Sequence, residues 1–408
     1  MESILYKEFT SKNGMKSKNR FFKGAMSEGL ADKNHLPTES LYRLYEKWAE
    51  GGTGIVVTGN VMVDRRALGE PKNVVVEDEK ALPYLEKWAE RGTGNNTELW
   101  MQLNHPGKQS PKGIVSETVA PSAIPLHKSI SRFFPHPREI TPTEIADVIK
   151  RFGQSAKLAK TAGFTGVQIH GAHGYLISQF LSPRHNHRQD EWGGDIHGRM
   201  KFLMEVYREI RSQTGSFPIS VKMNSADFMK AGFSEEEAIF VAEQLEKEGV
   251  DLLEISGGTY ENPQMTGKNV KESTKAREAY FIDFARKLRK SVDMPLCVTG
   301  GFRSKTGMES ALESHATDFV GVARPLAVYP NLPQLLKENR IQEVQLAPIK
   351  TGLNWIDSRA PLEITWYSQQ LERIGEGKEV RPNHPALVSL LQSVLKNGKD
   401  VFQMKRVK

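Results

Sequence analysis

The sequence predicts an α/β protein, a single (β/α)₈ TIM barrel with a helical C-terminal extension. Three observations lead to this prediction: eight short apolar or β-branched runs recur along the chain, helical patterns lie between most of them, and each run ends in polar or glycine residues. Strands that alternate with helices form parallel sheets with right-handed crossovers. Eight such units favour a closed barrel.

The eight runs are the expected barrel strands. Each is four to six residues long and rich in apolar or β-branched residues, as strands are. In chain order they are Arg20–Ala25, Gly54–Thr58, Leu99–Leu103, Gly166–Ile169, Ile219–Met223, Asp251–Ile255, Leu296–Thr299 and Phe319–Val322.

Capping residues mark two of the helices between these strands. Thr141 and Glu144 have the spacing of a capping box, and the helix that they begin should end at Gly163. Ser234 and Glu237 repeat the capping box before the sixth strand. These signals support the alternation of strand and helix.

Two stretches are longer than a plain barrel needs. The connection from residue 104 to residue 165 contains a Pro-rich and His-rich loop, and we expect it to cover the barrel mouth. After Pro330 further helical patterns follow, such as Ala386–Leu395. We therefore expect a catalytic barrel over residues 1–330 and an extension over 331–408 that packs on the barrel or at a subunit interface.

Composition excludes several classes of protein. The chain has 408 residues and 38% hydrophobic content, and no apolar run approaches the roughly 18 residues that a membrane span needs. The opening residues lack the apolar core of a signal peptide, so we expect a cytoplasmic protein with no membrane partner. Cys297 is the only cysteine, which excludes an internal disulfide and a four-cysteine cluster.

The net charge of +7 raises the question of nucleic-acid binding. The basic residues are scattered along the chain, and the one basic cluster is the tail Lys405, Arg406 and Lys408. Since scattered charge is typical of a solvated surface, we expect no nucleic-acid partner.

Active sites of such barrels form where the strands end at the C-terminal mouth. Side chains alternate along a strand, so Gln168 and His170 share one face of the fourth run, opposite apolar Val167 and Ile169. Lys222 has the same position on the fifth run. Because the apolar faces should meet the helices, these polar side chains are expected to point inward.

The motifs at these strand ends resemble the old yellow enzyme family of FMN-dependent ene-reductases. The resemblance covers about residues 5–330, and its most specific part is a His-x-x-His-Gly-Tyr run followed by Asn-x-Arg-x-Asp-x-Trp-Gly-Gly. The matching segments are Lys18-Asn19-Arg20, Ala25-Met26-Ser27, Gln102 to His105, His170 to Leu176, Phe180 to Pro183, Asn186 to Arg188, Asp190 to Gly194, Gly300-Gly301 and Gly321 to Arg324. The resemblance implies a homo-oligomeric oxidoreductase that binds FMN, takes hydride from NADH or NADPH, and reduces a small activated alkene.

The resemblance assigns catalytic roles to three residues. His170 and His173 match the pair that hydrogen-bonds the carbonyl oxygen of the substrate, and donors there stabilise the charge that hydride transfer places on that oxygen. Tyr175 matches the phenol that gives a proton to the α-carbon.

The resemblance also assigns residues to the flavin ring. Lys222 matches the cation beside flavin N1 and the C2 carbonyl, although arginine is common there, and an inward salt bridge to Glu254 is the structural alternative. Gln102 matches the amide on the pyrimidine edge. Further expected contacts with the ring are Ala25, Met26, Ser27 and Gly59.

The last two strands supply the expected phosphate site. Gly300 and Gly301 follow the seventh run, and Ala323 and Arg324 follow the eighth. Backbone N–H groups and an arginine at this place fit a phosphate group. A bare glycine pair is otherwise only a turn.

Other functions stay open at this point. His185 and His187 follow the histidine pair, and four histidines in one segment suggest a metal site as an alternative. Because no carboxylate stands at a metal-binding spacing from them, we predict no metal site. A second alternative is a dihydrouridine synthase, an FMN barrel with a catalytic cysteine in a loop. Cys297 instead lies inside a strand run, which predicts a buried core residue. A barrel that binds flavin or an anion without turnover is the non-enzymatic alternative. Departures from the family at Ser27, Lys222 and Trp192 leave the substrate and the flavin potential open.

Overall fold

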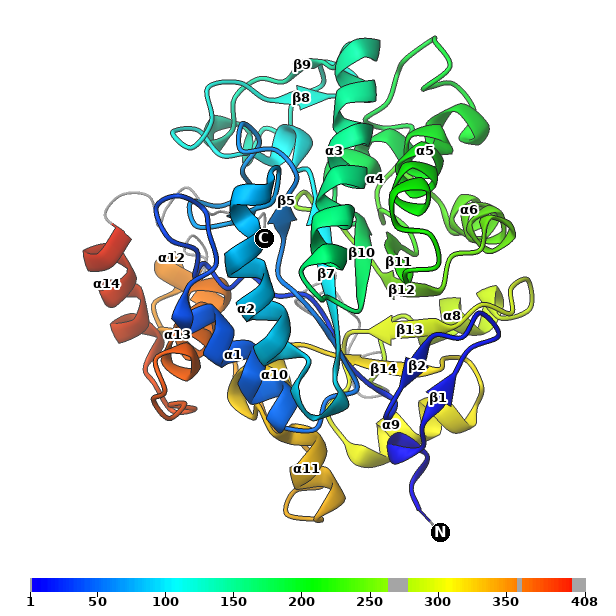
Figure 1. Cartoon of the computed structure of the whole chain (residues 1–408). Helices are drawn as coiled ribbons and strands as arrows, with labels where there is room; N and C mark the ends of the chain where they lie inside the picture. The colour runs from blue at the N-terminus through cyan, green and yellow to red at the C-terminus, as the bar shows by residue number, and fades with distance from the viewer. Residues whose placement is uncertain (1, 263–277, 358–361, 398–408) are drawn as a thin grey trace.

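A closed ring of parallel strands forms the centre of the molecule (Figure 1). The computed structural model describes residues 2–262, 278–357 and 362–397. Within these ranges eight strands form the ring, which closes because β10 pairs with β7 as well as with β11. In ring order they are β3 (Phe21–Lys23), β4 (Ile55–Val57), β7 (Glu98–Asn104), β10 (Gly166–Gly171), β11 (Ile219–Asn224), β12 (Leu252–Ser256), β13 (Leu296–Thr299) and β14 (Phe319–Val322). Each predicted run overlaps one of them, so the (β/α)₈ barrel is confirmed.

Helices surround the ring and connect successive strands (Figure 1). The longer ones are α1 (Glu39–Glu50), α2 (Leu82–Gly92), α3 (Pro142–Thr161), α5 (Ile196–Thr214), α6 (Glu235–Glu248), α8 (Ile282–Leu288) and α9 (Lys305–Glu313). Short helices follow β10 and β14, namely α4 (Leu176–Leu181), α10 (Arg324–Val328) and α11 (Leu332–Lys337).

Both predicted capping boxes are present. Thr141 accepts from the backbone N–H of Glu144, whose side chain reaches back to the N-cap, and Ser234 and Glu237 form the same pair before α6. Gly163 follows the end of α3 with φ +92°, a conformation that favours glycine. These local signals therefore set the helix boundaries.

Side chains alternate across the strands as the sequence predicts. On β12, Leu253 and Ile255 belong to the large apolar cluster that includes the surrounding helices. Leu252 joins a second cluster with Trp100, Cys297 and other residues of the barrel interior. Cys297 is fully buried there, which confirms the prediction of a core residue. Above this apolar layer the interior becomes polar.

Smaller strands extend the barrel at both ends. β1 (Phe9–Thr10) and β2 (Lys16–Ser17) form an antiparallel pair, and the Phe9 ring packs edge-on against Phe319 of the interior at 4.9 Å. β5 (Val61–Met62) and β6 (Val74–Val75) continue the sheet beside β7, while β8 (Val119–Ala120) pairs with β9 (Arg138–Glu139).

The long connection between β7 and α3 covers the barrel mouth, as predicted. Its apolar side chains Leu126, Ile130 and Phe134 form a buried cluster with Tyr175 and Tyr260 from two other strand ends. The loop therefore contributes an apolar lid over that part of the mouth.

In the described part of the chain after α11, the helices α12 (Asn354–Asp357), α13 (Leu362–Gly375) and α14 (Ala386–Asn397) follow the barrel. α13 lies beside α1, and Arg43 donates a hydrogen bond to the carbonyl of Gly375 at 3.0 Å. Gln369 on α13 donates to the carbonyl of Ser389 on α14 at 2.9 Å. The two last helices thus form a pair on the flank of the barrel (Figure 1).

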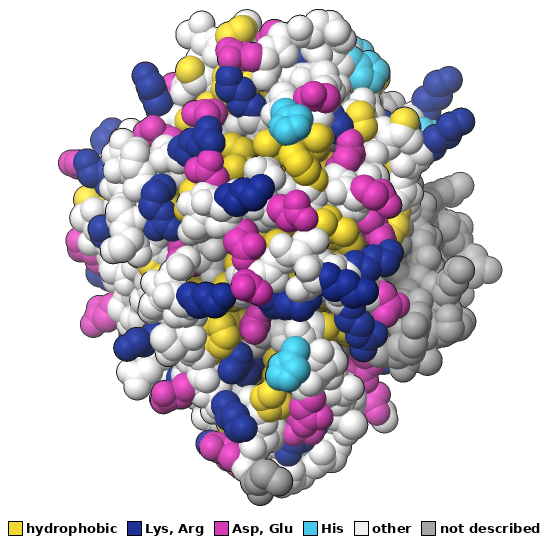
Figure 2. Space-filling view, turned by 90° about the vertical axis from the view of Figure 1, so that its right-hand side faces the viewer, with side chains coloured by type: hydrophobic (Ala, Val, Ile, Leu, Met, Phe, Trp, Pro, Cys, Tyr) yellow, Lys and Arg dark blue, Asp and Glu magenta, His cyan; other side chains and the backbone are white. Residues whose placement is uncertain are grey.

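The surface carries both signs of charge. Figure 2 shows lysine and arginine side chains interspersed with aspartate and glutamate over one face. The basic tail noted in the sequence lies outside the described residues. Among the described helices, none has the length and apolar character required to cross a membrane.

Candidate active site

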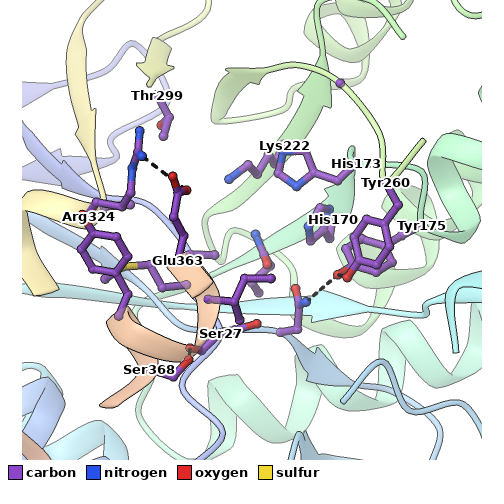
Figure 3. A pocket seen from close by; sticks show the side chains of 18 of the residues that line it. Ser27, His170, His173, Tyr175, Lys222, Tyr260, Thr299, Arg324, Glu363 and Ser368 are labelled. Carbon is purple, nitrogen blue, oxygen red and sulfur yellow. Dashed lines mark hydrogen bonds and ion pairs between the residues drawn. The ribbon is translucent and has the colours of Figure 1, made fainter. Parts of the chain in front are cut away.

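The strand ends at one mouth of the barrel enclose a cavity (Figure 3). Residues on or just past all eight barrel strands line it, and one wall belongs to α13 of the extension. The lining residues are Ala25, Met26, Ser27, Asn60, Gln102, His170, His173, Tyr175, Lys222, Gly257, Gly258, Thr259, Tyr260, Thr299, Ala323, Arg324, Glu363, Ile364, Tyr367, Ser368 and Leu371. The structure therefore brings together most of the predicted site residues.

The two histidines and Tyr175 converge in this cavity. His170 lies at the end of β10, and the chain then turns through His173 at φ +61° and Gly174 at φ +77°. The His170 ring centroid is 5.1 Å from that of His173 and 4.8 Å from that of Tyr175. The left-handed turn lets three polar rings from one short segment face the same space.

Hydrogen bonds orient both histidine rings. His170 Nδ1 accepts a hydrogen bond from the backbone N–H of Ala172 at 3.3 Å, so in the neutral ring the proton is on Nε2. His173 Nε2 lies 2.7 Å from Ser256 Oγ at the end of β12, and its backbone N–H donates to Asn224 at 3.2 Å. The rings are thus oriented before any ligand arrives.

Two residues beside Tyr175 were not predicted. The Tyr175 hydroxyl lies 2.8 Å from the Tyr260 hydroxyl and accepts a hydrogen bond from Asn60 at 3.3 Å. Both partners line the cavity. Asn60 and Tyr260 stand two and five residues past the second and sixth predicted runs, so the strand-end rule could have found them.

A chain of polar contacts crosses the barrel interior below the histidines. Lys222 forms an ion pair with Glu254 at 2.9 Å, which is the salt bridge that the sequence offered as the structural alternative. Gln168 donates to Glu254 at 2.9 Å, and Gln102 donates to Gln168 at 2.7 Å. Gln102 Oε1 is buried and has no hydrogen-bond partner among the described residues. The Gln102 carbonyl oxygen can therefore accept a hydrogen bond from a ligand in the cavity.

The end of the first strand borders both the cavity and the extension. Ala25, Met26 and Ser27 line the cavity; the Ser27 hydroxyl donates to Glu70, and its carbonyl accepts from Ser368 of α13 at 3.2 Å. Ser27 thereby links the barrel to the extension.

Gly59 does not reach the cavity. Its backbone N–H donates to Glu28 at 3.0 Å and to the Tyr45 hydroxyl at 2.9 Å, and Asn60 takes the place at the cavity wall. A Cβ at Gly59 would lie 2.5 Å from the carbonyl oxygen of Met26. The glycine therefore allows the ends of β3 and β4 to approach each other.

Lys23 is a buried cation that the sequence analysis passed over. It donates to the carbonyl of Val57 at 2.7 Å, and its ammonium group lies 4.2 Å from the centroid of the Trp48 ring. Burial lowers the pKa of Lys23 to about 8, while Glu28 at 3.8 Å opposes that shift. The position of Lys23 inside the first apolar run could have predicted a buried cation.

The predicted phosphate residues divide into two groups. Ala323 and Arg324 line the cavity, and Arg324 lies 3.7 Å from Glu363 of α13 (Figure 3). Gly300 and Gly301 stand just behind Thr299, with φ values of +123° and +93°. A Cβ at Gly301 would lie 2.8 Å from the Tyr280 ring. Glycine is required there because the 279–280 backbone passes so close.

Two other chemistries have little support in the described structure. His185 is buried between Lys108, 2.9 Å from its Nδ1, and Glu261, 3.3 Å from its Nε2. No cluster of three or more metal-binding side chains occurs among the described residues. Burial raises the pKa of the Cys297 thiol well above its usual value, which opposes formation of a nucleophilic thiolate.

The sequence of the chain is similar to those of known flavin oxidoreductases. A family model described as the NADH:flavin oxidoreductase / NADH oxidase family matches residues 4–343. The NADH-dependent flavin oxidoreductase iliE of Hypocrea jecorina (strain QM6a) is 39% identical over 355 residues, which cover 81% of this chain and 88% of that protein.

Solved structures share the barrel. A 2-naphthoyl-CoA reductase in complex with 2-naphthoyl-CoA superposes with a TM-score of 0.76 at 26% identity, over 82% of this chain and 52% of that chain. An old yellow enzyme homologue from Zymomonas mobilis superposes with a TM-score of 0.72 at 22% identity, over 84% of this chain and 94% of that chain.

Proposed function

The chain belongs to the NADH:flavin oxidoreductase / NADH oxidase family, the family of the old yellow enzymes, and from this premise we propose that it reduces the C=C bond of α,β-unsaturated carbonyl compounds or similar activated alkenes. As a family member it is an oxidoreductase that uses FMN and takes hydride from NADH or NADPH. The alkene, and the residues assigned to each step, are the proposal.

The residues of the cavity fit a flavin. The buried Gln102 Oε1 has no partner among the described residues and suits the imide N–H of the pyrimidine edge, while Lys222 supplies a cation near it. Ala25 and Met26 give an apolar wall, and Gly300, Gly301, Ala323 and Arg324 would surround the phosphate. Ser27 would lie at the ring edge. Bound FMN supplies the hydride for the alkene.

His170 and His173 would hold the carbonyl oxygen of the alkene. The His170 Nε2–H is set by the hydrogen bond at Nδ1, so it can donate to an oxygen that gains negative charge. His173 is held by Ser256 and Asn224 and needs little rearrangement. Such preorganisation stabilises an enolate more than it stabilises the ground state.

Tyr175 would protonate the α-carbon. Its ring stands against His170, and its oxygen already accepts a hydrogen bond from Asn60. A second phenol at 2.8 Å, Tyr260, can stabilise the phenolate that remains after the proton leaves. The convergence of the two histidines and this phenol in one cavity is the observation that carries the proposal.

The extension, residues 331–408, would complete the barrel domain, residues 1–330, by closing one side of the cavity. Glu363, Ile364, Tyr367 and Ser368 form that side. Burial raises the pKa of Tyr367, so its hydroxyl stays neutral at physiological pH. We expect these side chains to select the shape of the substrate.

We also propose that the chain forms a homo-oligomer. Exposed apolar side chains lie on one helix, α14, with exposed fractions of 39% for Leu387, 40% for Val388, 55% for Leu391 and 85% for Leu395. Such a row is typical of a surface that another copy covers. Light scattering of the wild type and of Leu391→Glu measures whether the substitution lowers the mass.

A comparison of the two half-reactions tests the function. In the Tyr175→Phe variant, reduction of the protein by NADH should keep the wild-type rate, whereas anaerobic reoxidation by 2-cyclohexenone should slow by about 100-fold. Tyr367→Phe is the matched control, because it removes a phenol from the opposite wall of the same cavity. Equal reoxidation rates in Tyr175→Phe and the wild type would remove Tyr175 as the acid.

A further inference from the structure

Four buried polar side chains form a continuous path across neighbouring barrel strands. Gln102, Gln168, Lys222 and Glu254 stand on β7, β10, β11 and β12, which are adjacent in the ring. Gln168 is the register partner of Gln102, and Lys222 is the register partner of Glu254. All four are at most 2% exposed. Solvent therefore contributes little to their hydrogen bonding.

The path has a direction, and Glu254 sets it. A carboxylate only accepts hydrogen bonds, so Gln168 must turn its Nε2 toward Glu254 Oε2, at 2.9 Å. Gln168 Oε1 then faces β7 and can only accept, which requires Gln102 to present its Nε2, at 2.7 Å. The Gln102 carbonyl oxygen is left for the cavity.

Reversal of the Gln102 amide would be costly. It would place two carbonyl oxygens against each other inside the barrel, where neither oxygen could find a donor from solvent. The orientation of Gln102 therefore follows from a carboxylate three strands away, which acts on Gln102 through Gln168.

The same carboxylate sets the charge beside the cavity. Lys222 Nζ lies 2.9 Å from Glu254 Oε1, and their side chains are 3% and 0% exposed. Because solvent screens charges little at this depth, the negative charge of Glu254 offsets much of the electric field of Lys222. A ligand beside Lys222 therefore meets a cation whose field is reduced by its partner.

We propose that Glu254 is a positioning residue for the flavin: through Gln168 it turns the Gln102 carbonyl oxygen toward the imide N–H, and through its ion pair it holds Lys222 and limits its field. The inference rests on the proposed placement of FMN between Gln102 and Lys222. It adds two residues, Gln168 and Glu254, that do not line the cavity.

The sign of the electrostatic effect is determined. Reduction places negative charge on the side of the flavin that Lys222 is proposed to face, so a stronger local positive field favours the reduced form. Removal of the Glu254 charge leaves the charge of Lys222 without compensation. The midpoint potential of bound FMN should therefore become more positive in Glu254→Gln.

The first experiment measures that potential by spectroelectrochemistry, with no alkene present. Glu254→Gln should shift it to more positive values, and Glu254→Asp, which keeps the charge, should restore at least half of the shift. Glu98→Gln is the matched control, because Glu98 begins β7 at the other end of the barrel. A Glu254→Gln potential equal to that of the wild type, or more negative, would overturn the inference.

The second experiment separates orientation from charge. Gln168→Met removes the link to Gln102 but leaves the Lys222–Glu254 ion pair, so FMN affinity measured by fluorescence quenching should weaken about tenfold while the potential moves less than in Glu254→Gln. Unchanged affinity would overturn the orientation half, and this arm decides alone if Glu254→Gln does not fold. A protein that never binds FMN would instead contradict the proposed function.

Discussion

The two sides of the cavity are held in different ways. On the barrel side, hydrogen bonds between strand ends hold polar side chains, as His173 after β10 is held by Ser256 of β12 at 2.7 Å. On the extension side, α13 meets the barrel through a hydrogen bond from Ser368 to Ser27 at 3.2 Å and a long ion pair from Glu363 to Arg324 at 3.7 Å. From this difference we propose that the chemistry belongs to the barrel and that the extension adjusts access to it.

The largest expected effect tests this division of labour. His170→Ala should slow reoxidation by 2-cyclohexenone by roughly 100- to 1000-fold, because it removes a preset donor to the enolate oxygen. Replacement of Ile364 by alanine on the opposite wall should change the rate by less than about tenfold, since it removes only a packing contact. Stopped-flow reoxidation of both variants makes the comparison, and equal losses would refute the division.

The next effect concerns the stability of the barrel side. Burial lowers the pKa of His105, which follows the end of β7, to about 4. The unfolded chain takes up this proton near pH 6.5 while the folded chain does not, so stability is lost as the pH falls from 6.5 toward 4. The loss should reach about 3 kcal/mol.

Urea unfolding at pH 7 and at pH 4.5 measures this loss. His105→Asn keeps an acceptor for the backbone N–H of Gly107, which His105 accepts at 3.1 Å, and should show a smaller decrease in stability. Identical decreases in wild type and His105→Asn would contradict the assignment.

The smallest effect sharpens the comparison at the contact between the two sides. Glu363→Gln removes a carboxylate from Arg324, and the pair is long and about one-third exposed at the arginine, so its contribution is at most about 1 kcal/mol. FMN affinity should rise by less than about fivefold, because Glu363 no longer offsets the positive charge that Arg324 presents to the phosphate. Isothermal titration of the apoprotein measures the change, and weaker FMN binding in Glu363→Gln would show that Glu363 supports the site.

Sequence reasoning recovered the barrel side because its signals are local. Alternation within a strand places Gln168 and Lys222 inward, and the motif from His170 to Tyr175 lies within one short segment. Capping boxes likewise mark helix ends from a few adjacent residues.

The remaining features depend on contacts between distant segments. Nothing periodic in residues 362–375 indicates that Glu363 and Tyr367 reach the cavity more than 300 residues after Ser27. The resemblance assigned Gly59 to the flavin, yet the backbone N–H of Gly59 donates to Glu28 and Tyr45, which only the folded chain brings near. Its role in flavin binding stays a prediction.

The most direct test of the central claim uses the wild-type protein alone. Protein bleached by NADH without oxygen receives 2-cyclohexenone, and both the visible spectrum and the products are followed. The account predicts that the oxidised flavin spectrum returns and that cyclohexanone appears in an amount equal to the flavin. A spectrum that returns only when oxygen is admitted, with the alkene recovered unchanged, would contradict alkene reduction by this barrel.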